Sequence, residues 1–251
     1  MSGHSKWSSI KHKKGAADAK RGQLFSKLSR AIIVAARDGG PDPDNNIALA
    51  NAIEKARASS MPKDNIERAI ARGSGAGADG QEYEQIVYEG YAPGGIALLV
   101  EALTDNRNRT ASDVRHLFAK HDGNLGASGA VAWLFERRGV VLVDAETVDE
   151  DDLTLAAAEG GADDVDRDGS SFRITCEGEA LPAVRAALES AGIASESADL
   201  TMLPKTTVSV EDEATARKIL RLVDALEEND DVQDVYANFD IPERVLEAVA
   251  P

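Results

Sequence analysis

The side chains best suited to chemistry crowd into the first 37 residues, where positive charge dominates. The segment holds one acid, Asp18, against nine cations: Lys6, Lys11, Lys13, Lys14, Lys20, Arg21, Lys27, Arg30 and Arg37. Its formal charge is therefore +8 and, because the whole chain stands at −16, residues 38–251 carry −24. Lys and Arg side chains neutralise phosphates and release the counterions condensed on them. A concentrated basic arm on an acidic body indicates a surface that binds nucleic acid.

Trp7 adds a second kind of chemistry to this arm, because an indole ring can stack on an unpaired base. A flexible basic segment can also order when it binds RNA, and His12 lies among the same cations. Alternatively, Trp7 packs back onto the first helix near Phe25, since an isolated Trp is more often buried than exposed. We assign nucleic-acid binding to these residues of the segment: Lys6, Trp7, Lys11, His12, Lys13, Lys14, Lys20, Arg21, Lys27 and Arg30.

Two simpler interpretations of the basic segment are a solvated tail and a cleavable transit peptide. Against the second, the cations continue into a helical pattern with an apolar stripe, which a cleaved segment does not need. The longest apolar run, Ala31–Ala36, is too short for the core of a secretory signal.

A second candidate contact is the polar turn Arg107-Asn108-Arg109-Thr110, which places two guanidinium groups on an otherwise acidic body. Arg107 and Arg109 either form salt bridges with neighbouring acids or make a further contact with nucleic acid. We include both among the candidate nucleic-acid-binding residues.

No set of residues has the spacing of a catalytic or metal site. His116 and His121 are five residues apart, which does not place them on one helix face, and no Cys joins them. The stretch Gly123–Gly129 lacks the Lys-Ser/Thr ending of a phosphate-binding loop and predicts a turn. Cys176 is expected in the core. We therefore expect no enzymatic activity, no catalytic residue, no cofactor and no small-molecule substrate.

Two acidic runs, Asp149–Asp152 and Glu227–Asp231, could in principle hold a divalent cation. They lie at expected helix ends without fixed ligand spacing, so a solvated surface is favoured and no metal is expected. A metal-dependent nuclease is the enzymatic alternative, and an assay with and without magnesium would test it.

Composition limits the cellular setting. The single cysteine excludes an internal disulfide and suits a reducing cytosol, so a cytoplasmic location is expected. No segment approaches the roughly 18 consecutive apolar residues that a membrane helix needs. The length of 251 residues predicts two or three domains.

The elements that must position the basic residues begin with three helices. Apolar residues at three- and four-residue spacing predict a first helix over 16–37, with its cations roughly opposite the packing face. A second helix is expected after Asp44-Asn45-Asn46, which are plausible caps, and a third begins at Pro62. Gly73–Gly80 then predicts a flexible linker.

Alternating patterns follow the linker. Two strands joined by Ala92–Gly95 are expected first, then a helix capped by Thr110 or Ser112, then a strand over Ala130–Phe135. Residues 139–204 have the order strand, helix, strand, strand, helix, strand, which is ferredoxin-like. The final segment predicts a strand over 206–210, a helix over 213–228 and a strand over 232–239.

These patterns predict an α+β protein in which an N-terminal three-helix domain is followed by two α/β domains. The last helix and strand complete the unit that begins after the linker, so the ferredoxin-like domain is inserted into it. The expected domains are 1–78, the discontinuous pair 79–137 with 205–251, and the insertion 138–204.

Five segments together resemble one known family: GHSKWSSIKHKKGAADAKRGQLFSKLSRAIIVAAR, MPKDNIERAIARGSG, YEGYAPGGIALLVEALTDNRNRT, GAVAWLFERRG and LEENDDVQDVYANFD. The resemblance is to the YebC/PmpR family of probable transcriptional regulators, which is related to a mitochondrial translational activator of cytochrome oxidase. It implies three domains, a cytoplasmic location and nucleic-acid binding without catalysis.

The resemblance leaves two targets open. One is DNA, bound by a transcriptional regulator; the other is ribosomal RNA, bound by a ribosome-associated translation factor that activates translation or relieves stalling at proline runs. A flexible Lys-rich arm with one Trp suits irregular RNA, and no turn-linked recognition helix is evident. The chain also departs from the family pattern where Asn46–Ala50 replaces a Pro-Arg-Leu-Arg motif and where Ala71-Arg72-Gly73 replaces Lys-Arg-Gly, so we assign no binding role to the second helix.

Overall fold

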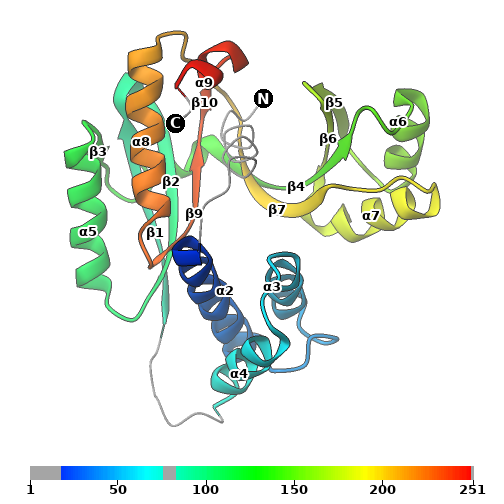
Figure 1. Ribbon diagram of the computed structural model, residues 1–251, viewed down its shortest axis with the longest axis horizontal. Coiled ribbons are helices and arrows are strands. Elements are labelled where there is room, and N and C mark those ends of the chain that lie inside the picture. The colour runs from blue at the N-terminus through cyan, green and yellow to red at the C-terminus, as the bar shows by residue number, and fades with distance from the viewer. Residues whose placement is uncertain (1–17, 76–82, 250–251) are drawn as a thin grey trace. The chain divides into compact units, whose positions relative to one another are not determined.

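The computed structural model describes residues 18–75 and 83–249. Six predicted binding residues lie outside them, namely Lys6, Trp7, Lys11, His12, Lys13 and Lys14, and so does most of the predicted linker. The chain divides into two compact units, one covering Trp133–Val208 and the other the described residues on either side of that segment. The fold is α+β, with helices first and two sheet-containing parts after them, as predicted (Figure 1).

The three predicted helices are α2 (Asp18–Gly39), α3 (Ile47–Ala58) and α4 (Lys63–Gly73). Their shared core is built from side chains including Ile32, Leu49 and Ile66. Asn46 caps α3 as predicted, because its side-chain oxygen accepts a 3.0 Å bond from Leu49 N. The Asn46 amide also donates to the carbonyls of Ala35 and Gly40, which ties the start of α3 to the end of α2.

After the linker, a four-stranded sheet has the order β3-β1-β2-β9. Its strands are β1 (Glu84–Ala92), β2 (Ile96–Thr104), β3 (Asn124–Leu125) and β9 (Val232–Ala237). The helices α5 (Arg107–Lys120) and α8 (Glu213–Glu227) pack their apolar sides against one face (Figure 1). Two further elements complete this core: the ribbon of β8 (Val208–Ser209) with β10 (Phe239–Asp240), and α9 (Glu243–Val249).

The segment between these halves forms the second unit. Its elements are β4 (Phe135–Asp144), α6 (Glu150–Glu159), β5 (Asp164–Asp168), β6 (Ser171–Glu177), α7 (Leu181–Ser190) and β7 (Ser197–Pro204). The antiparallel strand order β5-β6-β4-β7 with two helices is the ferredoxin-like arrangement that the sequence predicted. The three-domain division at 78, 137 and 204 stays a prediction.

The predicted strand over Ala130–Phe135 is wrong. Residues 132–134 form a 3₁₀ turn, and β4 begins only at Phe135. The buried carboxylate of Glu89 explains the difference, because it accepts the backbone N–H groups of Gly129, Val131 and Ala132 at 2.6–2.7 Å. Those groups are therefore not available to a strand ladder.

The predicted caps of α5 are also wrong. The side chain of Asn106 accepts from Arg109 N at 3.1 Å and caps the helix. Thr110 lies inside the helix and is fully buried.

Among the described residues, no helix is both long and apolar enough to cross a membrane.

Candidate nucleic-acid interface

One face of α2 carries three long polar side chains, Gln23, Lys27 and Arg30, at i, i+4 and i+7 spacing. All three reach backbone carbonyls just where α8 ends: Gln23 donates to Glu228 O, Lys27 Nζ donates to Glu227 O at 2.5 Å, and Arg30 donates to the carbonyl of residue 230. The last carbonyls of a helix lack partners within that helix and carry partial negative charge. The basic face of α2 therefore satisfies the C-terminal end of α8.

Asp231 joins α2 to α5 immediately after this helix end. Its side chain is 5% exposed, and Oδ1 accepts from Arg30 at 2.8 Å. Oδ2 accepts from Arg109 at 2.8 Å, from Thr110 at 2.7 Å and from Thr104 at 3.2 Å. One buried carboxylate thus receives donors from α2, β2 and α5.

The charge of Asp231 is stabilised in this setting. Burial acts to raise the pKa of Asp231, but the hydrogen bonds from Arg109 and Thr110 and the charges of Arg109 and Arg30 outweigh burial and hold that pKa below its ordinary value. Arg109 also pairs with Asp105 at 2.8 Å, and the hydrogen bonds to Asp231 and Asp105 raise the Arg109 pKa.

These contacts place several predicted binding residues inside the chain's own network. Lys27 and Arg30 bind the end of α8, and burial lowers the pKa of Lys27 despite the attraction of Glu227. Arg21 is exposed on α2. Lys20 lies in the first turn of α2, and its side chain is outside the description.

The two arginines of the polar turn differ sharply. Arg109 is held by Asp105 and Asp231, which is the salt-bridging alternative. Arg107 is exposed at the start of α5, and no acid pairs with it in residues 18–75 and 83–249. Both side chains are exposed, so the difference within this pair is that the Arg109 guanidinium is held by two acids and the Arg107 guanidinium is not.

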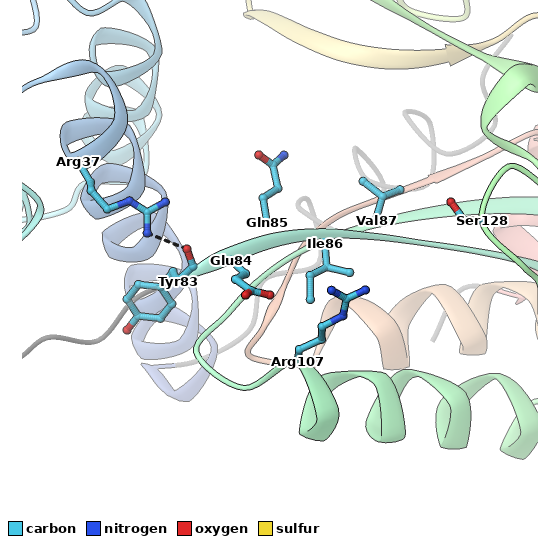
Figure 2. A pocket seen from close by; sticks show the side chains of 8 residues that line it. All are labelled: Arg37, Tyr83, Glu84, Gln85, Ile86, Val87, Arg107 and Ser128. Atoms are coloured by element: carbon cyan, nitrogen blue, oxygen red, sulfur yellow. Dashed lines mark hydrogen bonds between the residues drawn. The ribbon is translucent and has the colours of Figure 1, made fainter.

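Arg107 borders a hollow of about 640 Å³ beside β1. Figure 2 shows Arg107 extending from the start of α5 toward β1, with Arg37 and Ser128 at opposite ends of the site. Gln85, Ile86 and Val87 of β1 also line the hollow. Arg37 also donates to Tyr83 O at 2.8 Å and to Asp38 at 2.7 Å.

Within residues 18–75 and 83–249, no group of three or more His, Cys, Asp or Glu residues is placed to hold a metal ion. Burial lowers the pKa of His121, and the positive charges of Lys120 and Arg221 lower this pKa further. Cys176 is fully buried, and burial raises its thiol pKa.

Sequence reasoning missed Asp231 and Gln23. The run Glu227–Asp231 was expected to be a solvated surface, which is wrong for Asp231 because it is only 4% exposed. Two signals were available: the run directly precedes a predicted strand, and the first helix carries Gln23, Lys27 and Arg30 at complementary spacing.

Comparisons with known proteins agree over nearly the whole chain. Residues 5–76 match the family described as "TACO1/YebC protein N-terminal domain", and residues 83–239 match "TACO1/YebC second and third domain". A "Probable transcriptional regulatory protein" of Rubrobacter xylanophilus is 64% identical over 250 residues, covering 100% of both chains. One of the same description from Desulfotalea psychrophila is 54% identical with the same coverage.

A solved structure shares this architecture. The crystal structure of a conserved hypothetical protein from Aquifex aeolicus superposes with a TM-score of 0.80 at 53% identity. The match covers 90% of this chain and 93% of that one.

Proposed function

The chain belongs to the TACO1/YebC family, and we propose that it is a non-catalytic regulator of gene expression that binds nucleic acid, acting as a DNA-binding transcriptional regulator. The observation that carries the proposal is the partition of charge: +8 in residues 1–37 against −24 in the rest of a chain whose total is −16. Such a body repels polyanions everywhere except at its basic segment. The names of the relatives support a regulatory role.

Within the basic segment, the first 14 residues supply most of the affinity. Lys27 and Arg30 are already bound to the end of α8 and to Asp231, so their charges are partly neutralised inside the chain. We therefore assign the phosphate contacts to the cations that precede α2, together with Arg107, which has no acidic partner in the described structure. Arg109 acts mainly in the Asp231 network.

The second candidate is a ribosome-associated translation factor that binds ribosomal RNA. The packing of α2 favours this alternative, because a helix that reads duplex DNA places its polar face in the major groove. Lys27 and Arg30 instead face the end of α8. In either case we propose that the protein acts in the cytoplasm, without a cofactor, a membrane or a small-molecule substrate.

Deletion of residues 1–14 tests the proposal. Binding of labelled duplex DNA and of labelled ribosomal RNA fragments should weaken strongly for both, while the melting temperature should barely change, because exposed termini contribute little to a core. Equal binding by the truncated and full-length proteins would show that the arm is not the interface.

Two smaller changes separate stacking from charge. Trp7→Ala should cost about 1–3 kcal/mol of binding to single strands and leave the salt dependence unchanged. The double variant Lys13→Ala with Lys14→Ala should lower the salt slope by about two phosphate contacts. A Trp7→Ala protein that melts early yet binds normally would identify Trp7 as a packing residue.

A further inference from the structure

The outer edge of β1 is open over most of its length. On that side the short strand β3 pairs only with the far end of β1. Glu89 O points to this edge, where it accepts a 2.7 Å bond from Gly126 N. Because backbone groups of alternate residues face the same side of a strand, Gln85 and Val87 also direct their N–H and C=O groups to this edge. No strand among the described residues covers them.

The hollow beside β1 lies across this open edge. Successive side chains of a strand point to opposite faces, and Gln85, Ile86 and Val87 all line the hollow. Figure 2 shows Gln85 and Val87 on one side of β1 and Ile86 on the other. The hollow therefore combines backbone donors and acceptors with an apolar patch, and Val87 is 45% exposed there.

Charge is placed at the rim of the hollow. The Arg107 guanidinium is exposed and unpaired in the described part of the chain, so its donors are available to a phosphate. Glu84 borders the same hollow on the Arg107 side of β1, whereas Gln85 and Val87 lie on the opposite side, so the charged groups are on one side of the strand and an amide and an apolar side chain on the other. A ligand that is anionic at one end and a hydrogen-bonding ring at the other fits this distribution.

We propose that this hollow holds one unpaired nucleotide of a single-stranded nucleic acid, with its phosphate on Arg107 and its base against the edge of β1 at Gln85 and Val87. The hollow of about 640 Å³ is open to solvent and lined mainly by polar groups, so a nucleotide in it can remain part of a longer strand. An unstacked base can splay into a hollow and bond through its edge, whereas a base in a duplex cannot. The inference rests on the proposed function and names the kind of strand that this site accepts.

A matched pair of arginine variants tests the phosphate contact. Arg107 and Arg115 both belong to α5 and are exposed, but only Arg107 lines the hollow. The probes are a fluorescein-labelled 12-mer oligouridylate and a labelled 20-base-pair DNA duplex of mixed sequence, titrated against the full-length protein at several salt concentrations. Arg107→Ala should weaken oligouridylate binding about tenfold and lower its salt slope by about 0.7. Arg115→Ala should change oligouridylate binding less than about twofold.

A second pair tests occupation of the hollow itself. Val87→Glu places a carboxylate in the hollow, whereas Ala119→Glu adds the same charge to an exposed position of α5 outside it. Val87→Glu should weaken oligouridylate binding about tenfold while changing duplex binding less than about twofold. Ala119→Glu should leave both within about twofold. Melting curves check that all four variants are folded, which their exposure predicts.

The outcomes separate this inference from the proposed function. Oligouridylate binding that is unchanged in both Arg107→Ala and Val87→Glu overturns the nucleotide site, although arm-dependent binding would still support a nucleic-acid-binding protein. Equal losses for oligouridylate and duplex also overturn it, because they indicate a surface phosphate contact without a base in the hollow. A wild-type protein that binds neither probe refutes the proposed function and this inference together.

Discussion

At the scale of single residues, Asp231 links three elements, because donors from α2, β2 and α5 converge on its carboxylate. Asp231→Asn keeps the shape and removes the charge that Arg30 and Arg109 face. We expect a loss of about 2–4 kcal/mol in the free energy of unfolding, since a buried pair loses one partner while Arg109 keeps part of its hydration. Urea denaturation of the wild type and the variant measures this loss of unfolding free energy. Asp234→Asn removes an equal charge from an exposed position and should cost less than about 0.5 kcal/mol.

The same carboxylate predicts a dependence of stability on pH. Its pKa is lower in the folded chain than in the unfolded chain, so the folded state binds the proton less readily. The stabilisation is therefore fully present above the unfolded-state pKa and is lost as pH falls through the folded-state pKa, beginning below about pH 5. The difference in unfolding free energy between wild type and Asp231→Asn should shrink over this acid range. A difference that stays constant from pH 7 to pH 3 would contradict the assignment.

Glu89 shows why some residue roles could not be predicted from the sequence. Its carboxylate accepts three backbone N–H groups from residues 129–132, about 40 positions away. Burial acts to raise the pKa of Glu89, and these three bonds outweigh burial and lower it. An isolated Glu within a strand pattern carries no signal of a partner so distant in sequence. The cations of the arm could be recognised from the sequence, because the evidence for them is the local composition.

At the scale of elements, periodicity predicted the helices and most strands well, because burial on one face dictates both the apolar spacing and the packing. The boundaries of α2, α3 and α8 fall within a few residues of expectation. Prediction failed where a side chain overrides the local pattern. The apolar run before β4 has the composition of a strand, but its backbone N–H groups at Val131 and Ala132 donate to the Glu89 carboxylate. The short helix α9 was missed because its seven residues show less than two turns of periodicity.

Two glycines in the helical part give opposite predictions for the same substitution. A Cβ on Gly73 would lie 2.4 Å from Ile33 O, so Gly73→Ala must push α4 away from α2. We expect a loss of about 1–3 kcal/mol in unfolding free energy. A Cβ on Gly22 would meet nothing within 4 Å, and Gly22→Ala should stabilise α2 by about 0.5–1 kcal/mol. Thermal unfolding of the two variants measures both changes in stability. If both substitutions changed the stability in the same direction, the packing of α4 on α2 would be contradicted.

At the scale of the whole molecule, the distribution of charge and the insertion of one unit into another are the two organising features. Charge partition was readable from composition alone. The consequence of this charge partition for α2 could not be predicted, because the sequence does not reveal that the acidic end of α8 meets the basic face of α2.

The structure of the insertion predicts that it folds by itself. Its core is closed within Trp133–Val208, where Val141, Phe172 and Leu188 are buried among side chains of the same unit. Its two ends also meet, because Phe135 pairs with Pro204 in neighbouring antiparallel strands. Residues 133–208 expressed alone should therefore give a dispersed amide NMR spectrum and a cooperative melting curve.

The complementary variant replaces residues 135–204 of the full chain, from the start of β4 to the end of β7, with a short Gly-Ser linker. Because the flanking ends are held close by the Lys205 N to Leu134 O bond of 2.8 Å, a linker of a few residues should span the gap without strain. The remaining chain should keep cooperative unfolding and its arm-dependent binding of nucleic acid, since the basic segment and the Asp231 network lie outside the insertion. A random-coil spectrum for the isolated insertion, or loss of cooperative unfolding in the shortened chain, would mean that the two units depend on each other for stability.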